Sequence, residues 1–461
     1  MNWQSVFAAM LPEHMLLLGI VLLLVLEIGS EKPRGALPLS LVIVGAAAAA
    51  AAWLALAGYS AAPFPGHYSV SATGLLAKAV VLALAFPVLL LARDDFPEGP
   101  FYPLLLSSLY GFCLLLSSDS FLTLFLGLEI MSLPVYVLVL LAFGRPESPE
   151  AALKYLILGG TATAMFLMGV SLLYGGSASL ALSVFGSALA SRDIMAIAGV
   201  VLIVLAFFLK AAIVPFHAWA PDAYEGASLS VTAYMATIIK AGVLLAALRL
   251  FGTAPVSGSM VDLLALLPLV SIVWGNLTAM RQQSFRRMIA YSSIAHAGYL
   301  FYAFLGDGPG RFQAVVFYLL AYGVMNVLAF ASIPAGANDT ERDRLDNLQG
   351  LFHRDPWAAM MIGVAMLSLA GIPPLPGFVA KFLIFKNVIA AGYTTYAVLG
   401  LIGSYLGIYF YLRVIQMMFI NPESASAPRV TLAPLALVAS LICVVPAVVL
   451  AVFPGWVFGR F

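Results

Sequence analysis

Fourteen separate runs of the sequence are apolar and long enough to cross a lipid bilayer as helices. A spanning helix needs about 20 mostly apolar residues, because hydrocarbon offers backbone polar groups no partner outside the helix. The chain has 461 residues, of which 63% are hydrophobic and 9% charged, whereas a soluble domain carries roughly 25% charged residues. We therefore expect an all-α polytopic membrane protein with about 14 transmembrane helices. The runs lie at 12–29, 36–58, 70–92, 101–118, 120–143, 150–174, 194–216, 228–250, 261–280, 287–305, 312–335, 357–386, 395–420 and 430–453.

Composition also excludes several classes of function. The formal net charge of +1 argues against a nucleic-acid partner. The two cysteines, Cys113 and Cys443, both lie in apolar runs, so we expect neither a disulfide framework nor a cysteine-ligated cluster. The first apolar run has no basic residue before it and is interpreted as a span rather than a cleaved signal. A glycine-rich phosphate loop is also missing, so we expect no nucleotide and no other cofactor in this chain.

The charge of the loops predicts the orientation of the chain. Loops that follow odd-numbered runs are rich in basic residues, for example Lys32, Arg34, Arg93 and Arg145. Because basic loops stay on the cytoplasmic side, we expect these loops in the cytoplasm and both termini in the periplasm. The predicted location is the bacterial plasma (inner) membrane.

Two apolar runs are interrupted by prolines, which remove a backbone donor and break a helix. Run 194–216 ends at Pro215, and run 357–386 contains Pro373, Pro374 and Pro376. Broken backbone inside a membrane must be buried in protein or line a wet cavity. Breaks five runs apart suggest an internal repeat of five-helix units. We expect a first repeat over 99–250 and a second over 251–420, flanked by N-terminal spans over 1–98 and a C-terminal span over 421–461, all in one transmembrane domain.

Six of the seven lysines lie inside these apolar runs, whereas most arginines lie at their ends or between them. Burial can remove the proton of a lysine, but an arginine stays charged. A lysine at the centre of a helix costs about 2.5–3.5 kcal/mol on insertion scales, so each must be paired, hydrated or neutral. Glu129 is the one carboxylate deep inside the middle runs and cannot pair with all of them. The pattern favours proton exchange. The six are Lys78, Lys154, Lys210, Lys240, Lys381 and Lys386.

The depth of each charge separates the candidates. Deep positions favour a functional role, whereas Lys78 and Lys386 lie near the ends of their runs, where snorkelling to the interface explains them equally well. Histidines in the bundle serve as proton relays or as packing residues. The candidate proton-relay residues are Glu129, Lys210, Lys240, Lys381, Lys154, His217 and His296.

Polar side chains also recur at helical spacing and either hold a chain of waters or link helices. The stripes are Ser230, Thr237 and Lys240; Ser292, His296 and Tyr299; Tyr318, Tyr322 and Asn326; and Tyr405, Tyr409 and Arg413.

Several sequence blocks resemble the antiporter-like membrane subunits of respiratory complex I and their relatives in Mrp-type sodium/proton antiporters. The likeness spans about residues 100–420. Within that family, Lys381 in the twelfth run and the end of the chain after the fourteenth favour the N-type subunits of bacterial NADH-quinone oxidoreductase. The blocks are Leu124-Phe125-Leu126-Gly127-Leu128-Glu129, Glu150-Ala151-Ala152-Leu153-Lys154-Tyr155, Val214-Pro215-Phe216-His217-Ala218-Trp219-Ala220-Pro221-Asp222, Arg287–His296 and Gly371-Ile372-Pro373.

The resemblance implies two inverted five-helix repeats and roles for particular charges. Glu129 and Lys210 would act as a coupled pair, Lys240 would continue a central hydrophilic axis, and Lys381 would be the charge of the second half. Lys154 matches the sixth-helix lysine of the N-type subunits.

The family likeness also implies that the chain is a non-redox subunit of a proton-translocating NADH:quinone oxidoreductase, without catalysis of its own. NADH, FMN, iron–sulfur clusters and quinone would then belong to partner subunits. The implied partners are the antiporter-like M-type and L-type subunits and the small K-, J- and A-type subunits, together with the lipid bilayer.

Three other functions remain open at this point. A Mrp-type cation/proton antiporter subunit would use the same charges. An organic-solute transporter would need a substrate pocket at the midplane, often with opposed charges, which suits the excess of lysine less well. A structural scaffold would give no reason for the buried lysines.

Overall fold

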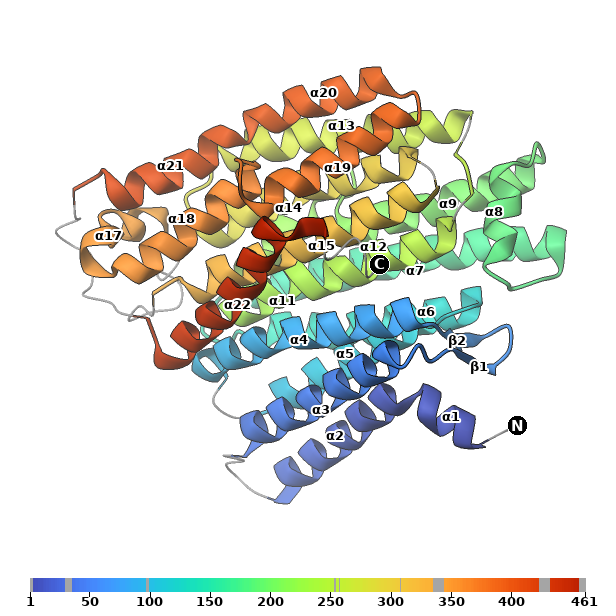
Figure 1. Cartoon of the computed structure of the whole chain (residues 1–461), viewed down its shortest axis with the longest axis horizontal. Helices are drawn as coiled ribbons and strands as arrows, with labels where there is room; N and C mark the ends of the chain where they lie inside the picture. Colours follow the sequence, from blue (N-terminus) through green and yellow to red (C-terminus); the bar gives the residue numbers. More distant parts are fainter. Residues whose placement is uncertain are drawn as a thin grey trace.

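The computed structural model describes residues 3–29, 35–96, 99–252, 254–256, 258–306, 308–334, 344–422 and 432–455, and these residues are almost entirely helical. The helices run side by side in one bundle (Figure 1). The N-terminal helices form one flank of the bundle, and α20 and α21 lie at the opposite flank. Lys32 and Arg34, which contributed to the predicted orientation, lie outside the described residues.

The first half consists of helices and one short hairpin. They are α1 (Trp3–Ala9), α2 (Leu11–Gly29), α3 (Ala36–Leu56), β1 (Ala61–Phe64), β2 (Tyr68–Val70), α4 (Ala72–Asp95), α5 (Phe101–Leu116), α6 (Phe121–Leu140), α7 (Ser148–Ser177), α8 (Ser183–Leu189), α9 (Ile194–Ala211), α10 (Trp219–Gly226), α11 (Leu229–Tyr234), the π-helix η1 (Met235–Ile239) and α12 (Lys240–Phe251).

The second half is entirely helical in the described residues. Its elements are α13 (Ser259–Ala279), α14 (Phe285–Tyr302), the 3₁₀ helix η2 (Ala303–Leu305), α15 (Gly308–Ala331), the 3₁₀ helix η3 (Leu345–Leu348), α17 (Leu351–Arg354), α18 (Pro356–Ala370), α19 (Pro376–Ala390), α20 (Thr394–Leu406), α21 (Ile408–Phe419) and α22 (Pro434–Val452).

The membrane-spanning architecture predicted from hydropathy is confirmed. Twelve helices of the described chain are long and apolar enough to cross a bilayer, and the shorter apolar helices α5 and α18 occupy the two remaining predicted runs. The strands β1 and β2 pair antiparallel, with Ala61 opposite Val70 and Phe64 opposite Tyr68. The hairpin and α8 lie at one end of the bundle, and α17 lies at the other (Figure 1). The sequence did not predict the hairpin.

The two runs expected to break at their prolines, 194–216 and 357–386, are both broken. Helix α9 ends at Ala211 and is followed by the left-handed Ala212 (φ 63°), whereas α18 ends at Ala370 and is followed by the left-handed Gly371 (φ 87°). Side chains satisfy the freed backbone groups. At the first break the Trp219 indole donates to the Leu209 carbonyl at 2.9 Å, so the broken backbone is buried in protein.

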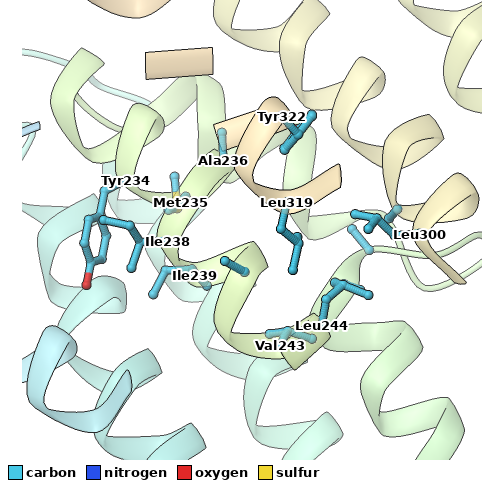
Figure 2. Close-up of a cluster of buried hydrophobic side chains, with 14 of the residues drawn as sticks. Tyr234, Met235, Ala236, Ile238, Ile239, Val243, Leu244, Leu300, Leu319 and Tyr322 are labelled. Carbon is cyan, nitrogen blue, oxygen red and sulfur yellow. The ribbon is translucent and has the colours of Figure 1, made fainter. Parts of the chain in front are cut away.

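The π-helix η1 lies in the centre of the core, directly before Lys240. Figure 2 shows Ile238, Ile239 and Val243 of this region packed near Leu319 of α15 and Leu300 of α14. All five of these side chains are buried. A single π turn shifts the side chains that follow it around the helix axis and is common at functional sites. Tight apolar packing therefore fixes the direction in which Lys240 leaves its helix.

For two sets of polar side chains, one of the interpretations left open by the sequence does not hold. Lys78 does not snorkel to the interface: it is fully buried and its ammonium lies 2.5 Å from Glu13 Oε1. Tyr405 and Tyr409 do not line the interior, because they are 74% and 61% exposed on the outer face of α20 and α21. Spacing along a helix gives the shared face of such residues, but not the direction in which that face points. Lys386, by contrast, is exposed, in agreement with an interfacial lysine.

We predict that Gly371→Ala destabilises the second break. Alanine in the left-handed region costs about 1–2 kcal/mol, and a Cβ at residue 371 would lie 3.0 Å from Lys381 Cδ. Thermal unfolding of the purified protein in detergent measures the loss. The matched control is Gly363→Ala in α18, where the new Cβ makes an ordinary 3.5 Å contact with Phe419 and should leave stability equal or higher. Equal stability of the two variants would contradict the prediction.

Candidate functional site

The predicted pair of Glu129 and Lys210 is present in the structure. Glu129 lies in the middle of α6 and Lys210 in the last turn of α9, with Glu129 Oε1 and Lys210 Nζ 3.0 Å apart. The hydroxyl of Thr163 on α7 donates to the same carboxylate oxygen at 2.6 Å. Both charged side chains are mostly buried, with 17% of Glu129 and 8% of Lys210 exposed. Three helices thus meet at one carboxylate oxygen.

The first break holds Lys210 in place. Helix α9 stops one residue after it, and Ile213 N donates to the Phe208 carbonyl across the left-handed turn. The Val214 N–H donates to Ser271 Oγ on α13 at 2.8 Å. Because the break is tied to neighbouring helices by hydrogen bonds, a movement of α10 or α13 would be transmitted directly to the last turn of α9.

Lys240 is buried among neutral acceptors. Its ammonium donates to the Ser293 carbonyl at 2.6 Å and to the Ser293 hydroxyl, both on α14. The ring centroid of Tyr322 on α15 lies 5.9 Å from the same nitrogen, within the range of a cation–π contact. All of these partners are neutral, in contrast to the carboxylate beside Lys210.

His296 connects two tyrosines. Its Nδ1 lies 2.7 Å from the Tyr318 hydroxyl of α15, and its Nε2 lies 3.0 Å from the Tyr411 hydroxyl of α21. Tyr411 and Ser292 are a further 2.6 Å apart. A neutral imidazole carries one donor and one acceptor nitrogen, so a change of tautomer reverses the direction of this chain. His296 thus links α14 to α15 and α21 through the two tyrosine hydroxyls.

Lys381 lies at the second break. Lys381 extends from α19, and its ammonium donates to the carbonyl of Ala370 at 3.0 Å. Ala370 is the last residue of α18. The ring centroid of Tyr299 lies 5.0 Å away. A cavity of about 470 Å³ adjoins Lys381 and is lined by aromatic side chains that include Phe378, Phe382 and Tyr405. The ammonium therefore has neutral partners, like that of Lys240, and lies next to an open space.

Glu129, Lys210, Lys240, His296 and Lys381 are called the row below. Two other predicted site residues, Lys154 and His217, lie apart from it. Lys154 is 42% exposed and forms ion pairs with Asp222 at 2.6 Å and with Glu150 at 2.7 Å. Arg287 joins the same cluster, at 2.9 Å from Asp222. His217 is half-buried, and its Nε2 accepts from the Trp274 indole of α13 at 3.1 Å. Among the described residues, neither side chain forms a hydrogen bond or ion pair with Glu129, Lys210, Lys240 or Lys381.

Sequence reasoning missed the hydroxyl and carbonyl partners. Thr163, Ser293 and Tyr411 contact the row from other helices, and nothing in the sequence distinguishes them from other polar residues in apolar runs. Tyr411 is instructive, because the predicted stripe contained Tyr409. The two are neighbours on α21, yet Tyr411 is buried and Tyr409 faces outward.

Comparisons with known proteins agree with this fold. A polytopic helical bundle with two broken helices and a row of buried lysines belongs to the class of membrane proteins that move protons or cations. Residues 118–407 match the family described as NADH:quinone oxidoreductase/Mrp antiporter, TM, and the chain belongs to this family. It is 40% identical, over 89% of its length and 88% of the relative's, to NADH-quinone oxidoreductase subunit N of Pelobacter propionicus.

Solved structures have the same fold. One chain of respiratory complex I from Thermus thermophilus superposes with a TM-score of 0.83 at 33% identity, over 97% of this chain and 98% of that one. A chain of the Mrp complex from Dietzia superposes with a TM-score of 0.83 at 21% identity, over 98% and 96% of the two chains. The second likeness is one of fold alone.

We predict that Thr163→Val weakens the Glu129–Lys210 pair. A hydrogen bond to a charged group contributes about 1.5–3 kcal/mol, so its loss should slow proton movement roughly 10-fold, measured in membrane vesicles that contain the variant. Thr161→Val is the matched control, because Thr161 lies on the exposed face of the same helix and bonds only to the Ile157 carbonyl. A native rate in Thr163→Val would mean that the hydroxyl does not act on the pair.

Proposed function

We propose that this chain is a proton-translocating membrane-arm subunit of an NADH-quinone oxidoreductase and that its proton path follows the buried row of charges. The row comprises Glu129, Lys210, Lys240, His296 and Lys381. The single observation that carries the proposal is the contrast between the lysines: Lys210 faces a carboxylate, whereas Lys240 and Lys381 face neutral oxygens and aromatic rings. Such a series offers protons sites of unequal affinity inside one protein.

The proposed step begins at the ion pair. While Glu129 Oε1 lies next to Lys210 Nζ, the negative charge stabilises the protonated ammonium. When the two separate, Lys210 loses that stabilisation, its N–H bond breaks, and the proton passes through water to an acceptor further along the row. Gain or loss of one charge partner changes the pKa of an ionisable group by about 1–3, which is enough to redirect the proton. His296 then passes it between the two halves by a change of tautomer.

Electron transfer belongs to partner subunits in this proposal. NADH, FMN, iron–sulfur clusters and quinone would bind there, and the chain would receive the energy as a movement at its contacts with other membrane-arm subunits of the M, L, K, J and A types. Among the described residues, no group of three or more histidine, cysteine or acidic side chains is arranged to hold a metal ion. The relatives' shared name, NADH-quinone oxidoreductase subunit N, supports this assignment.

The orientation in the membrane is also proposed. The described basic residues Arg93, Arg145, Arg287 and Arg354 lie at helix ends or in loops on the side of the bundle predicted to face the cytoplasm. The hairpin would then face the periplasm, together with both termini. In this arrangement Lys154, Asp222 and Arg287 form a charged cluster near the cytoplasmic side. We assign Lys154 to proton entry, while His217 beside Trp274 would respond to movement of the first break.

A Mrp-type cation/proton antiporter subunit is the second candidate, because that group shares the family and the fold. The partners in the native membrane distinguish the two. Copurification with quinone-reducing subunits favours the first candidate, whereas copurification with small Mrp-type subunits alone favours the second.

We predict that Lys210→Ala abolishes most proton movement by the assembled complex. A positioned proton-transfer group contributes at least about 100-fold, so the remaining rate should be a few per cent or less. The measurement is the acidification of inverted membrane vesicles on addition of NADH, with assembly checked by immunoblot. Lys386→Ala is the control, because Lys386 is exposed on α19 and should tolerate the change. Native pumping by the Lys210→Ala complex would refute the proposed path.

A further inference from the structure

One short helix, α10, reaches the surroundings of three lysines. It directly follows the first break and packs against α7 and α14. At its start, the Trp219 indole donates to the Leu209 carbonyl, one residue before Lys210. In its middle, Asp222 accepts from the ammonium of Lys154 at 2.6 Å.

The third contact of α10 is made by Tyr224. This side chain is buried, and its hydroxyl lies 3.3 Å from the Ser293 hydroxyl of α14. Ser293 is also the residue that accepts from the Lys240 ammonium, through its carbonyl at 2.6 Å and through the same hydroxyl. The Ser293 hydroxyl therefore contacts both a tyrosine of α10 and a lysine of the row.

This pair of hydroxyls can satisfy both protonation states of Lys240, because each hydroxyl can donate one hydrogen bond and accept others. When Lys240 is charged, its N–H donates to the Ser293 hydroxyl, which donates in turn to Tyr224. When Lys240 is neutral, its nitrogen accepts from the Ser293 hydroxyl, which accepts in turn from Tyr224. A buried donor or acceptor without a partner is costly. The reversal therefore lets a proton leave Lys240 without breaking the chain of hydrogen bonds.

The contact between the two hydroxyls is sensitive to the position of α10. Its length of 3.3 Å exceeds the usual O–H···O distance of about 2.5–3.0 Å. A shift of α10 towards α14 by a few tenths of an ångström would strengthen the hydrogen bond, and an equal shift away would break it. The position of α10 thus decides whether Ser293 has a second partner.

The same helix carries charges that water can reach. Asp222 and Glu225 both accept from Arg287 of α14, at 2.9 and 2.7 Å, and Asp222 also pairs with Lys154. The two acidic side chains are 28% and 33% exposed. Tyr224 lies between them in the sequence. A change in the charge or pairing of this cluster therefore acts on the helix that carries Tyr224.

The other ionisable groups near Lys240 differ in what they contact. The ring centroid of Tyr322 on α15 lies 5.9 Å from Lys240 Nζ. His296, three residues after Ser293 on α14, bonds to two other tyrosine hydroxyls. In the part of the chain that the structure describes, Lys240 forms no ion pair, and its hydrogen bonds are those to Ser293. Ser293 and its partner Tyr224 are therefore the groups that distinguish charged from neutral Lys240 by hydrogen bonding.

We propose that Tyr224 is a positioning residue for Lys240 and that, through the Ser293 hydroxyl, it makes proton exchange at Lys240 depend on the position of α10. In this way α10 connects the charged cluster around Asp222 to the row. When Lys240 releases its proton, the N–H bond breaks and the proton passes to water. Ser293 and Tyr224 each keep one O–H bond and change only its direction. The inference rests on the proton-moving function proposed above and adds the element that regulates it.

Tyr224→Phe tests this proposal, because it removes the hydroxyl and keeps the ring. We expect normal assembly, a roughly 2- to 10-fold lower ratio of protons pumped to NADH oxidised, and a shifted pH profile of pumping. Both are measured in inverted membrane vesicles. Tyr234→Phe is the matched control, because Tyr234 is a buried tyrosine whose hydroxyl bonds to another serine, Ser108, at 2.8 Å. It should keep both readouts native. A native ratio and pH profile in Tyr224→Phe would overturn the proposal.

A double-variant cycle shows whether Tyr224 acts through Ser293. Ser293→Ala should also lower the ratio, and a native ratio in this variant would overturn the proposal by itself. In the Ser293→Ala background, Tyr224→Phe should cause no further loss, because the hydroxyl through which it acts is gone; additive losses would show that Tyr224 acts elsewhere. Lys210→Ala reports on the row separately. Loss of pumping in Lys210→Ala with native pumping in Tyr224→Phe would refute this inference and leave the proposed function standing.

Discussion

The free-energy cost of an ammonium group inside a membrane bundle governs this structure. Each buried lysine must find oxygen or π-electron partners within the protein, because a lysine left alone at the centre of a helix costs about 2.5–3.5 kcal/mol. The chain meets this cost in two ways. Lys210 and Lys78 have a carboxylate that also binds a hydroxyl, whereas Lys240 and Lys381 have backbone carbonyls and aromatic rings.

The broken helices supply the backbone carbonyl that binds one of these lysines. An intact helix uses its carbonyls internally, but the last turn of a helix leaves carbonyls without an internal partner. At the second break the ammonium of Lys381 takes the carbonyl of Ala370, and Gly371 leaves room for the approaching side chain. At the first break the Trp219 indole takes the Leu209 carbonyl instead, so Lys210 remains directed towards Glu129. The two breaks therefore leave their neighbouring lysines with different partners, a carboxylate for Lys210 and a backbone carbonyl for Lys381.

Much of this arrangement could be predicted from the sequence, because membrane spans and proline breaks depend on local composition. The depth of Glu129 and Lys210 was also sufficient to predict their pairing. The sequence could not show which face of each helix contacts helices that are distant in the chain. Glu13 and Lys78 are 65 residues apart in the sequence, so their pairing was not predicted, and snorkelling of Lys78 was one of two open interpretations. Tyr405 and Tyr409 share a face that points outward, while Tyr411 points to His296.

In the proposed mechanism, the difference between the two kinds of lysine gives the row its direction. In a medium of effective dielectric about 20, a unit charge at about 10 Å changes the energy of another by roughly 1.7 kcal/mol, or more than tenfold in a proton equilibrium. While Glu129 and Lys210 are paired, their fields largely cancel at Lys240. Separation or loss of a proton exposes one charge, and Lys240 has only neutral partners to oppose it. In the proposed mechanism, a small movement at the first break would therefore shift the proton affinity of the next lysine.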